Sequence, residues 1–349
     1  MEALLKAWDG ERIIIEFDWP TGAWIIIAIH STRRGPAGGG TRMKPYSTME
    51  AAMADALELA RSMSYKFACA DMSRGGGKAV IAVPPDLTPQ ARADLLRRYG
   101  ALIHQLGGMF QTGPDVGTSS ADMDIIAESG APYVFGRTVQ AGGAGDSGPA
   151  TAIGVLHGIG VVCQQLFGTS ALAGRRILVQ GAGSVGGRLI RLLREANASV
   201  LFSDVDEATI RQIREIPGVS FVPPEEVYDM PCDIFAPCAL GGILNQETIP
   251  RLKCRAVAGS ANNQLARPED AELLRKRGIL YAPDFVINVG GAMAIVGMET
   301  MGWSEAEANT HVTQNIEHML RQTFDLAAAR NISTADAARS VAETRLSGH

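Results

Sequence analysis

The sequence has no excess of positive charge, no paired cysteines and no hydrophobic run long enough to span a membrane. Its 32 Lys and Arg residues against 37 Asp and Glu residues give a net charge of −5, which offers no reason to expect nucleic acid as a partner. The apolar runs at residues 24–29 and 79–83 have the length of strands, whereas a membrane helix needs about 20 apolar residues. We therefore expect neither a nucleic-acid nor a membrane partner.

The cysteines and the first residues indicate a reducing compartment. The five cysteines are odd in number and none belongs to a CxxC pair, which favours reduced, mostly buried thiols over a disulfide framework. The opening Met-Glu-Ala-Leu-Leu lacks the basic start and apolar core of a signal peptide. We expect a cytoplasmic protein without a metal site.

The length and the glycine content indicate a two-domain α/β protein. A chain of 349 residues is too long for one small core, and its 39 glycines suit many tight strand-to-helix turns. We expect an α/β substrate domain over residues 1–135 and a Rossmann-type, doubly wound nucleotide-binding domain over residues 136–324, with a cleft between them. The glycine-rich segment 142–149 is the expected linker region. The C-terminal helices, about 325–349, are expected to pack back on the first domain.

The first domain is expected to begin with a hairpin. Two β-branched runs, residues 12–17 and 24–30, are joined by turn residues. The glycine cluster at residues 35–42 is compatible with a flexible loop, and an amphipathic helix is expected over residues 48–63.

Two lysines and one aspartate of the first domain are candidates for chemistry. The glycines at 75–77 predict a turn, and Lys78 follows them at the start of an apolar strand. Such a lysine is either solvated or has a pKa low enough to act as a base. Lys66, in an apolar segment, either extends to solvent or meets an anion. Asp115 ends a short strand and is either a turn residue or a proton carrier.

The second domain carries a dinucleotide-binding fingerprint. A strand at residues 177–180 runs directly into Gly181, Gly183 and Gly186, spaced as G-x-G-x-x-G, and a helix follows. The glycines permit a tight turn, and the helix N-terminus supplies donors to a pyrophosphate. Asp204 ends the next strand, where it would accept from the ribose hydroxyls and repel a 2′-phosphate, which favours NAD over NADP.

Three later strands of this domain each end in small or polar residues. The carboxyl ends of parallel strands border the binding crevice, so we expect Asn262, Asn263 and Asn288 near the nicotinamide, although any one of them could be a turn residue. Helices are expected over residues 305–329 and 334–346.

Seven segments, taken together, resemble the glutamate/leucine/phenylalanine/valine dehydrogenase family. They follow the family's order and spacing and lie at residues 35–42, 63–66, 75–78, 112–116, 148–152, 235–242 and 259–263. The resemblance implies reversible oxidative deamination, in which an L-amino acid, NAD and water give a 2-oxo acid, ammonia and NADH. The expected partners are these small molecules and further copies of the chain in a homo-oligomer.

The resemblance also implies a role for each matching residue. Lys78 would be the catalytic lysine that activates water, Asp115 would exchange protons with the substrate nitrogen, and Lys66 would hold the α-carboxylate. The other implied substrate-binding residues are Gly38, Gly39, Met63, Gly113, Pro114, Asn262 and Ala292. The implied cofactor-binding residues are Thr151, Gly181, Gly183, Ser184, Val185, Gly186, Asp204, Cys238, Ala239, Ala261, Asn263 and Asn288.

The implied substrate has a hydrophobic side chain. Glutamate enzymes of the family use a lysine in the first glycine cluster, and residues 35–40 contain none. Gly38, Gly113 and Ala292 are smaller than their counterparts in leucine enzymes, which would enlarge the pocket and favours L-phenylalanine. Leucine, valine or another aromatic amino acid is the alternative, because a methylene-sized difference is worth only ~1–3 kcal/mol.

Two other classes fit the sequence less well. A non-catalytic nucleotide-binding regulator would be expected to lose Lys66, Lys78 or Asp115, and all three are present. A 2-hydroxy-acid dehydrogenase would need a histidine base near the crevice, and the second domain offers none in such a setting.

Overall fold

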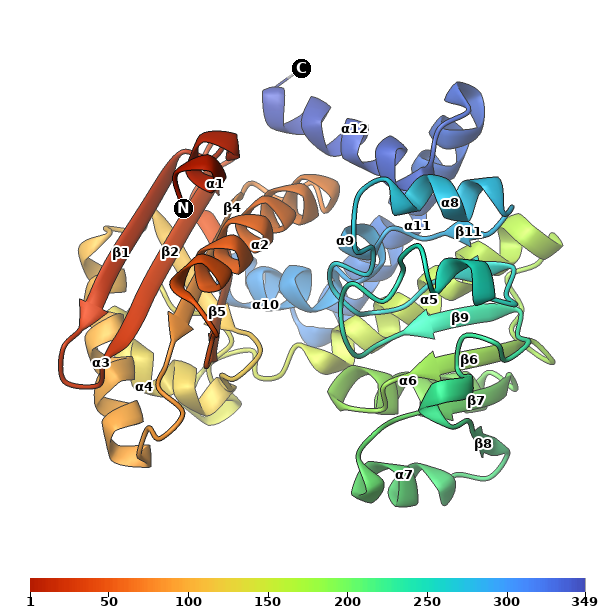
Figure 1. Cartoon of the computed structure of the whole chain (residues 1–349), viewed down its shortest axis with the longest axis horizontal. Coiled ribbons are helices and arrows are strands. Elements are labelled where there is room, and N and C mark those ends of the chain that lie inside the picture. Colours follow the sequence, from red (N-terminus) through yellow and green to blue (C-terminus); the bar gives the residue numbers. More distant parts are fainter. Residues whose placement is uncertain (349) are drawn as a thin grey trace. The chain divides into compact units, whose positions relative to one another are not determined.

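The computed structural model describes residues 1–348, which form two compact units (Figure 1). Unit 1 comprises Met1–Asp146, Ile295–Gly302 and the described chain from Ala342 onward, and unit 2 comprises Ser147–Ala294 and Trp303–Val341. Unit 1 thus extends past the expected boundary at residue 135 into the glycine-rich segment 142–149. Of the expected segment 325–349, residues before Ala342 group with unit 2, because the long helix that leads to them packs there, and His349 lies outside the described residues.

A five-stranded mixed sheet forms the centre of unit 1. Its strands are, in spatial order, β1 (Arg12–Asp18), β2 (Ala23–Ser31), β4 (Gly75–Ala82), β3 (Ala37–Lys44) and β5 (Phe110–Pro114). β2 pairs antiparallel with β1 and β4, whereas β3 runs parallel to β4 and β5. The predicted hairpin is confirmed as β1 and β2.

Helices cover both faces of this sheet. They are α1 (Glu2–Ala7), α2 (Met49–Cys69), α3 (Pro89–Gln105) and α4 (Ser120–Gly130), followed by the 3-10 turn η1 (Val139–Ala141). Ile26 and Val80 meet α2 on one face, whereas Ile27 and Ile81 lie in the core formed with α3 and α4. This alternation follows from the two-residue period of a strand, and each buried isoleucine stabilises the fold by roughly 1.5–3 kcal/mol.

Both glycine clusters of unit 1 lie in strands. Residues 37–40 belong to β3 rather than to a flexible loop, and residues 75–77 begin β4 rather than forming a turn. The reason is steric, because a Cβ added to Gly76 would lie 2.0 Å from the backbone N of Ser64 on α2. Glycine therefore permits the helix to approach the strand closely. α2 also continues past its predicted end at residue 63, so that Lys66 lies in its last turn.

A returning segment of the chain completes unit 1. Residues 295–302 include the second part of α10 (Gly290–Met301). Oε1 of Glu299 accepts hydrogen bonds from the backbone N of Gly136 at 2.9 Å and of Ala144 at 2.7 Å. This carboxylate thus holds the segment through which the chain leaves unit 1.

A six-stranded, entirely parallel sheet forms the centre of unit 2. Its spatial order is β11 (Leu280–Tyr281), β10 (Ala256–Val257), β9 (Ile234–Pro237), β6 (Arg176–Gln180), β7 (Ser199–Ser203) and β8 (Val219–Phe221). The chain starts in the middle and proceeds outward in both directions, which is the doubly wound order. The expected Rossmann-type fold is confirmed.

One helix of unit 2 needs separate mention because of its apolar character. Besides α10, the helices are α5 (Gly148–Phe167), α6 (Ser184–Glu195), α7 (Glu207–Arg214), α8 (Asp270–Lys276), α9 (Asp284–Ile287), α11 (Glu305–Arg330) and α12 (Thr334–Ser347), with 3-10 turns η2 (Pro224–Glu226) and η3 (Ile249–Arg251). Within residues 1–348, α5 alone is long and apolar enough to cross a membrane by length and composition. However, 56% of its apolar window is buried, and α6 and α11 pack against it. α5 is therefore a core helix.

The five cysteines are free thiols. Cys69 and Cys163 are buried, whereas Cys232, Cys238 and Cys254 are half-buried. Burial raises the pKa of all five thiols, which keeps them protonated at neutral pH. In the described chain, no group of three or more His, Cys, Asp or Glu side chains could hold a metal ion.

Candidate active site

The expected catalytic residues of unit 1 share one face of its sheet. Met43 and Ala79 point into the α3–α4 core, so Arg42 and Lys78, each one position earlier, point to the opposite face, which α2 covers in part. Asp115 comes directly after β5, where Thr41 pairs with Pro114. The register of the strands therefore brings Asp115 beside Arg42.

These side chains form a continuous chain of charges. Nζ of Lys78 lies 3.1 Å from Oδ2 of Asp115, and Nε of Arg42 donates to the same oxygen at 2.8 Å. Nη1 of Arg42 then donates to Oδ1 and Oδ2 of Asp55 on α2, at 3.0 and 3.1 Å. The hydroxyl of Tyr46 also donates to Asp55, at 2.5 Å. Arg42 thus links the strand end to the helix above it.

The electrostatics of this chain set the protonation of its members. Burial lowers the pKa of Lys78, and the positive charge of Arg42 adds to this effect, whereas the carboxylate of Asp115 opposes it. Burial alone would raise the pKa of Asp115, but Lys78 and Arg42 outweigh burial and bring that pKa to about 2. Asp115 is therefore a carboxylate at neutral pH. Because the pKa of Lys78 is lowered, a larger fraction of Lys78 is in the neutral amine form than for a solvated lysine.

A hydroxyl holds the loop that carries Asp115. Oγ1 of Thr118 accepts from the backbone N of Asp115 at 2.9 Å and donates to the carbonyl oxygen of Thr41 at 2.8 Å. A Cβ added to the intervening Gly117 would lie 1.8 Å from the carbonyl oxygen of Met43. The loop thus folds tightly against β3, which fixes the carboxylate of Asp115.

Lys66 lies on the helix that packs against the strand of Lys78. It is buried in the last turn of α2 and is only 8% exposed. Met63, one turn earlier on the same helix, is half-buried. Both lysines are thus buried, and α2 and β4, which carry them, pack directly together.

The small residues of the expected substrate pocket have different surroundings. A Cβ added to Gly113 would have its nearest neighbour 3.6 Å away, at the carbonyl oxygen of Phe135. A Cβ added to Gly38 would lie 3.0 Å from the ring of Phe67 and 3.8 Å from Cδ of Arg74. The side chains of Phe67 and Arg74 therefore occupy space that the sequence was expected to leave open at Gly38.

The two other expected residues here, Gly39 and Pro114, belong to the strands themselves. A Cβ added to Gly39 would lie 1.8 Å from the carbonyl oxygen of Gly77, so the pairing of β3 with β4 needs glycine at this position. Pro114 ends β5.

Sequence reasoning missed Arg42, Asp55, Tyr46 and Arg74. Arg42 ends the first glycine cluster, and alternation along a strand would have placed it on the face of Gly38. Asp55 and Tyr46 gave no signal, since Asp55 of α2 meets Arg42 of β3 only in the folded chain and Tyr46 joins them through its hydrogen bond to Asp55. Arg74 directly precedes the run 75–77, and its position before that run was the signal available.

The fingerprint turn of unit 2 has the geometry of a phosphate-binding turn. Gly181 follows β6 with a φ of 90°, in the left-handed region that favours glycine. A Cβ added to Gly186 would lie 1.9 Å from the carbonyl oxygen of Gly181, whereas one added to Gly183 would meet nothing within 4 Å. Gly183 caps α6 without a side-chain hydrogen bond. The turn is thus closed on its inner side and open at Gly183, directly before Ser184 and Val185, with which the helix begins.

Asp204 is fixed beside this turn. Its Oδ2 accepts from the backbone N of Ala182 at 2.6 Å, and its Oδ1 accepts from those of Val205 and Asp206 at 2.7 and 2.9 Å. A direct hydrogen bond thus joins Asp204 to the fingerprint turn that lies 22 residues earlier in the sequence. The carboxylate stands at the end of β7, next to the helix start.

The strand ends of unit 2 bring several other expected residues together. Nδ2 of Asn288 donates to Oδ1 of Asn262 at 2.8 Å and to the carbonyl oxygen of Ser260 at 3.1 Å. Oδ1 of Asn288 is buried and, among the described residues, has no hydrogen-bond partner. Asn263 adopts a positive φ of 49°, and its backbone N donates to Asp284 at 2.6 Å. A buried amide acceptor thus lies near the strand ends without a partner among the described residues.

The remaining expected residues border the same strand ends and helix starts. Cys238 and Ala239 follow β9, and a Cβ added to Gly181 would lie 2.5 Å from Cβ of Ala239. The backbone N of Ala261 donates to the carbonyl oxygen of Pro237 at 2.9 Å. Thr151, in the first turn of α5, lies against the first turn of α10, which also carries Ala292.

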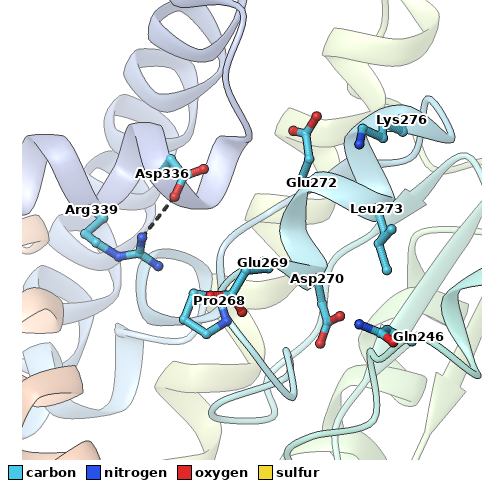
Figure 2. Close-up of a pocket in the computed structure, with 9 residues that line it drawn as sticks. All are labelled: Gln246, Pro268, Glu269, Asp270, Glu272, Leu273, Lys276, Asp336 and Arg339. Atoms are coloured by element: carbon cyan, nitrogen blue, oxygen red, sulfur yellow. Dashed lines mark hydrogen bonds and ion pairs between the residues drawn. The ribbon is translucent and has the colours of Figure 1, made fainter.

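A separate cavity of unit 2 has a different lining. It measures ≈ 580 Å³ and is bordered mostly by charged side chains of α8 and the start of α12. Figure 2 shows Arg339 turned toward Asp336, with which it forms an ion pair at 2.9 Å. None of the expected site residues described here lines this cavity.

Comparison with known proteins agrees with this geometry. Residues 22–130 match the model "Glu/Leu/Phe/Val dehydrogenase, dimerisation domain", and residues 203–348 match "Glutamate/Leucine/Phenylalanine/Valine dehydrogenase". Leucine dehydrogenase of Geobacillus stearothermophilus is 40% identical over 98% of this chain and 92% of its own. The chain belongs to the glutamate/leucine/phenylalanine/valine dehydrogenase family. The resemblance seen in the sequence is confirmed, and this family member is an amino acid dehydrogenase.

Other relatives carry different substrate names. L-tryptophan dehydrogenase of Nostoc punctiforme is 43% identical over 92% of this chain and 89% of its own. Phenylalanine dehydrogenase of Caldalkalibacillus thermarum is 40% identical over 97% of this chain and 91% of its own. The family member is thus similar to dehydrogenases of the leucine, tryptophan and phenylalanine type.

Solved structures share the fold of this dehydrogenase. The crystal structure of L-tryptophan dehydrogenase from Nostoc punctiforme superposes with a TM-score of 0.81 at 39% identity, covering 100% of this chain and 99% of that one. A hetero-hexameric glutamate dehydrogenase from Thermus thermophilus has a TM-score of 0.81 at 24% identity, with 99% and 93% coverage. The second comparison shows the fold alone.

Proposed function

We propose that this enzyme catalyses the reversible NAD-dependent oxidative deamination of a hydrophobic L-amino acid, L-phenylalanine above all. An L-amino acid, NAD⁺ and water give the 2-oxo acid, ammonium, NADH and a proton. The observation that supports this proposal most directly is the buried pair of Lys78 and Asp115, whose atoms lie 3.1 Å apart. The pair combines a lysine of lowered pKa with a carboxylate of pKa about 2.

The pair can move each proton that this reaction requires. Asp115, as a carboxylate, accepts a proton from the substrate ammonium, which leaves a neutral amine whose Cα can lose a hydride. Neutral Lys78 then takes a proton from the water that attacks the resulting iminium carbon. As the carbon–nitrogen bond breaks, Asp115 returns its proton to the departing nitrogen. The hydroxyl proton passes to the ammonia to give ammonium, and Lys78 releases the proton taken from water to solvent, which regenerates both groups. Lys66 pairs with the α-carboxylate, and Arg42 holds Asp115 in place.

The residues of unit 2 fit a dinucleotide. The open turn at Gly183 and the N-terminus of α6 would offer donors to a pyrophosphate, and Oδ1 of Asn288, which has no hydrogen-bond partner among residues 1–348, would offer an acceptor to a carboxamide. Asp204 would accept from the adenosine ribose and repel a 2′-phosphate, so we propose NAD rather than NADP. When bound, the dinucleotide supplies the hydride acceptor.

The proposed preference for L-phenylalanine follows from the expected pocket. At Gly113 an added Cβ would come only into ordinary van der Waals contact, 3.6 Å from the carbonyl oxygen of Phe135, so glycine leaves the pocket wider there than an alanine would. Leucine, valine and tryptophan are the alternatives, since the names of similar enzymes include leucine and tryptophan.

We also infer a homo-oligomer that assembles through β1. This edge strand and its neighbourhood expose apolar side chains, with Ile15 48%, Trp19 85% and Trp24 39% exposed. An unpaired strand edge with apolar residues favours association with a second strand. The matching family model bears the words "dimerisation domain". For an enzyme with five free thiols, the cytoplasm is the proposed location.

The deciding experiment is NADH formation with a panel of L-amino acids. We expect the highest kcat/KM with L-phenylalanine, and a higher value with leucine or valine would refute that preference while leaving the reaction intact. Lys78→Ala should lower kcat by about 10²–10⁴-fold because it removes the base. Lys276→Ala, at an exposed lysine of α8, is the matched control and should leave kcat unchanged. Near-normal turnover by Lys78→Ala would refute the proposed mechanism.

A further inference from the structure

Arg74 is a buried cation beside the expected substrate pocket. It is 9% exposed and directly precedes the glycines of β4. Its Nη1 donates to Oε1 of Gln111, and its guanidinium carbon lies 4.9 Å from the centre of the Phe135 ring. In the described chain no carboxylate forms an ion pair with it, and burial is the one cause that lowers its pKa. Among residues 1–348, the Gln111 bond is the hydrogen bond seen for this side chain, so most of its five N–H donors have no acceptor there.

The side chain of Arg74 lies over Gly38. Gly38 pairs with Gly76 of β4 on one side and with Gln111 of β5 on the other. Because Gly38 has no side chain, Cδ of Arg74 comes within 3.8 Å of the place where a Cβ would stand, and the ring of Phe67 comes within 3.0 Å. Arg74 and Phe67 therefore lie side by side over Gly38, on the sheet face that carries Lys78.

We propose that Arg74 determines side-chain specificity by stacking its guanidinium against the aromatic ring of the substrate. This inference rests on the proposed function, because it takes the substrate side chain to lie against the Arg74 side chain that covers Gly38. A guanidinium is planar and weakly hydrated, and it stacks on aromatic faces, as it already does on Phe135. An aliphatic side chain in the same place offers a buried cation no compensating interaction.

The first test compares two substrates of similar size, only one of which has a π face. For the wild type, Arg74→Met and Arg74→Lys, kcat/KM is measured with L-phenylalanine and L-cyclohexylalanine. Arg74→Met should reduce the ratio of the two values by about 3- to 30-fold, the range that a cation–π contact supplies. Arg74→Lys, which keeps the charge without the plane, should reduce it less. Arg33→Met, at an exposed arginine, should leave the ratio unchanged.

The second test uses the electronics of the ring. Fluorine withdraws electrons from the ring face, so kcat/KM of the wild type should fall from L-phenylalanine to its 4-fluoro and pentafluoro derivatives. The fall should disappear in Arg74→Met, because no cation then faces the ring. A purely structural role for Arg74 would lower all values together and would leave the dependence on fluorine intact.

Several results would overturn the proposal. These are an unchanged ratio in Arg74→Met, a fluorine dependence that persists in this variant, and a preference for L-glutamate that Arg74→Met abolishes. If the wild type oxidises none of the amino acids, the proposed function fails first. In that case calorimetry measures the affinities for L-phenylalanine and L-cyclohexylalanine in the presence of NAD, and their ratio replaces the ratio of kcat/KM values. If neither compound binds, the role of Arg74 is overturned.

Discussion

At the residue scale, Arg42 controls the chemistry of a site it was not expected to join. It donates to Asp115 and Asp55 at once and is itself largely buried. Its charge pushes the pKa of both Lys78 and Asp115 downward. Arg42 therefore acts as a positioning residue that sets the protonation of the pair.

We predict that Arg42→Met moves the acidic limb of the pH profile of kcat/KM to higher pH. This limb reports loss of the proton from Lys78, and without the neighbouring cation the pKa of Lys78 rises. The pKa of Asp115 rises from about 2 as well. Since a lowered carboxyl pKa stabilises the fold above its unfolded value of about 3.8, Arg42→Met should also lower Tm at neutral pH.

The control for this prediction is Arg61→Met. Arg61 is 39% exposed and pairs with Asp9 away from the site, so its loss should leave the pH profile in place. If the acidic limb of the pH profile of Arg42→Met stayed in place or moved to lower pH, Lys78 would not be the group that determines this limb.

A second prediction at this scale concerns cofactor choice. Asp204→Asn removes the charge that would repel a 2′-phosphate, so we expect kcat/KM with NADP to rise relative to NAD by about tenfold. Asp206→Asn is the matched control, two residues further on, because Asp206 caps α7 through Thr209 and an asparagine can also cap. If the ratio of kcat/KM with NADP to kcat/KM with NAD were equal in the two variants, Asp204 would have no role in choosing the cofactor.

At the element scale, glycine decides how closely α2 approaches β4. A Cβ at Gly76 would lie 2.0 Å from the Ser64 N and 2.4 Å from its Cα. These are backbone atoms, so the helix itself must shift. Lys66 and Asp55 are on this helix, so the shift would reach the site.

We predict that Gly76→Ala destabilises the enzyme by about 1–3 kcal/mol or more, the range for overpacking a core. Urea unfolding gives the measurement. Gly160→Ala in α5 is the matched control, since its nearest contact is 3.5 Å away and a helical Gly→Ala change is neutral or stabilising by about 0.5–1 kcal/mol. If Gly76→Ala were as stable as the wild type, the close packing of α2 on β4 would be wrong.

What the sequence could predict at this scale depends on how local the signal is. The hairpin of β1 and β2 and the turn from Gly181 to Gly186 were predictable, because each is a continuous segment with its own turn chemistry. Residues 35–42 and 75–77 were not, because glycine resembles a loop until the neighbouring helix shows why no side chain fits. The contacts of Arg42 with Asp55 and of Arg74 with Phe135 join segments far apart in the chain, which only the fold brings together.

At the scale of the whole molecule, association is expected to depend on β1. We predict that Ile15→Lys lowers the oligomeric state measured by light scattering, because a charge on an edge strand opposes pairing with another edge. Val139→Lys, at another exposed aliphatic side chain, 70% exposed in η1, is the control and should not change the mass. A mass that Ile15→Lys leaves unchanged would place the interface elsewhere.

Glu299 has a consequence for how the chain is made. Its carboxylate serves the backbone of Gly136 and Ala144, yet the chain passes through most of unit 2 before this residue is reached. On the ribosome, residues 1–146 therefore emerge long before the group that satisfies these two donors. Because unit 1 also includes the described chain from Ala342 onward, it can complete its fold only after nearly the whole chain has been synthesised, so the two units mature during translation in overlapping rather than successive order.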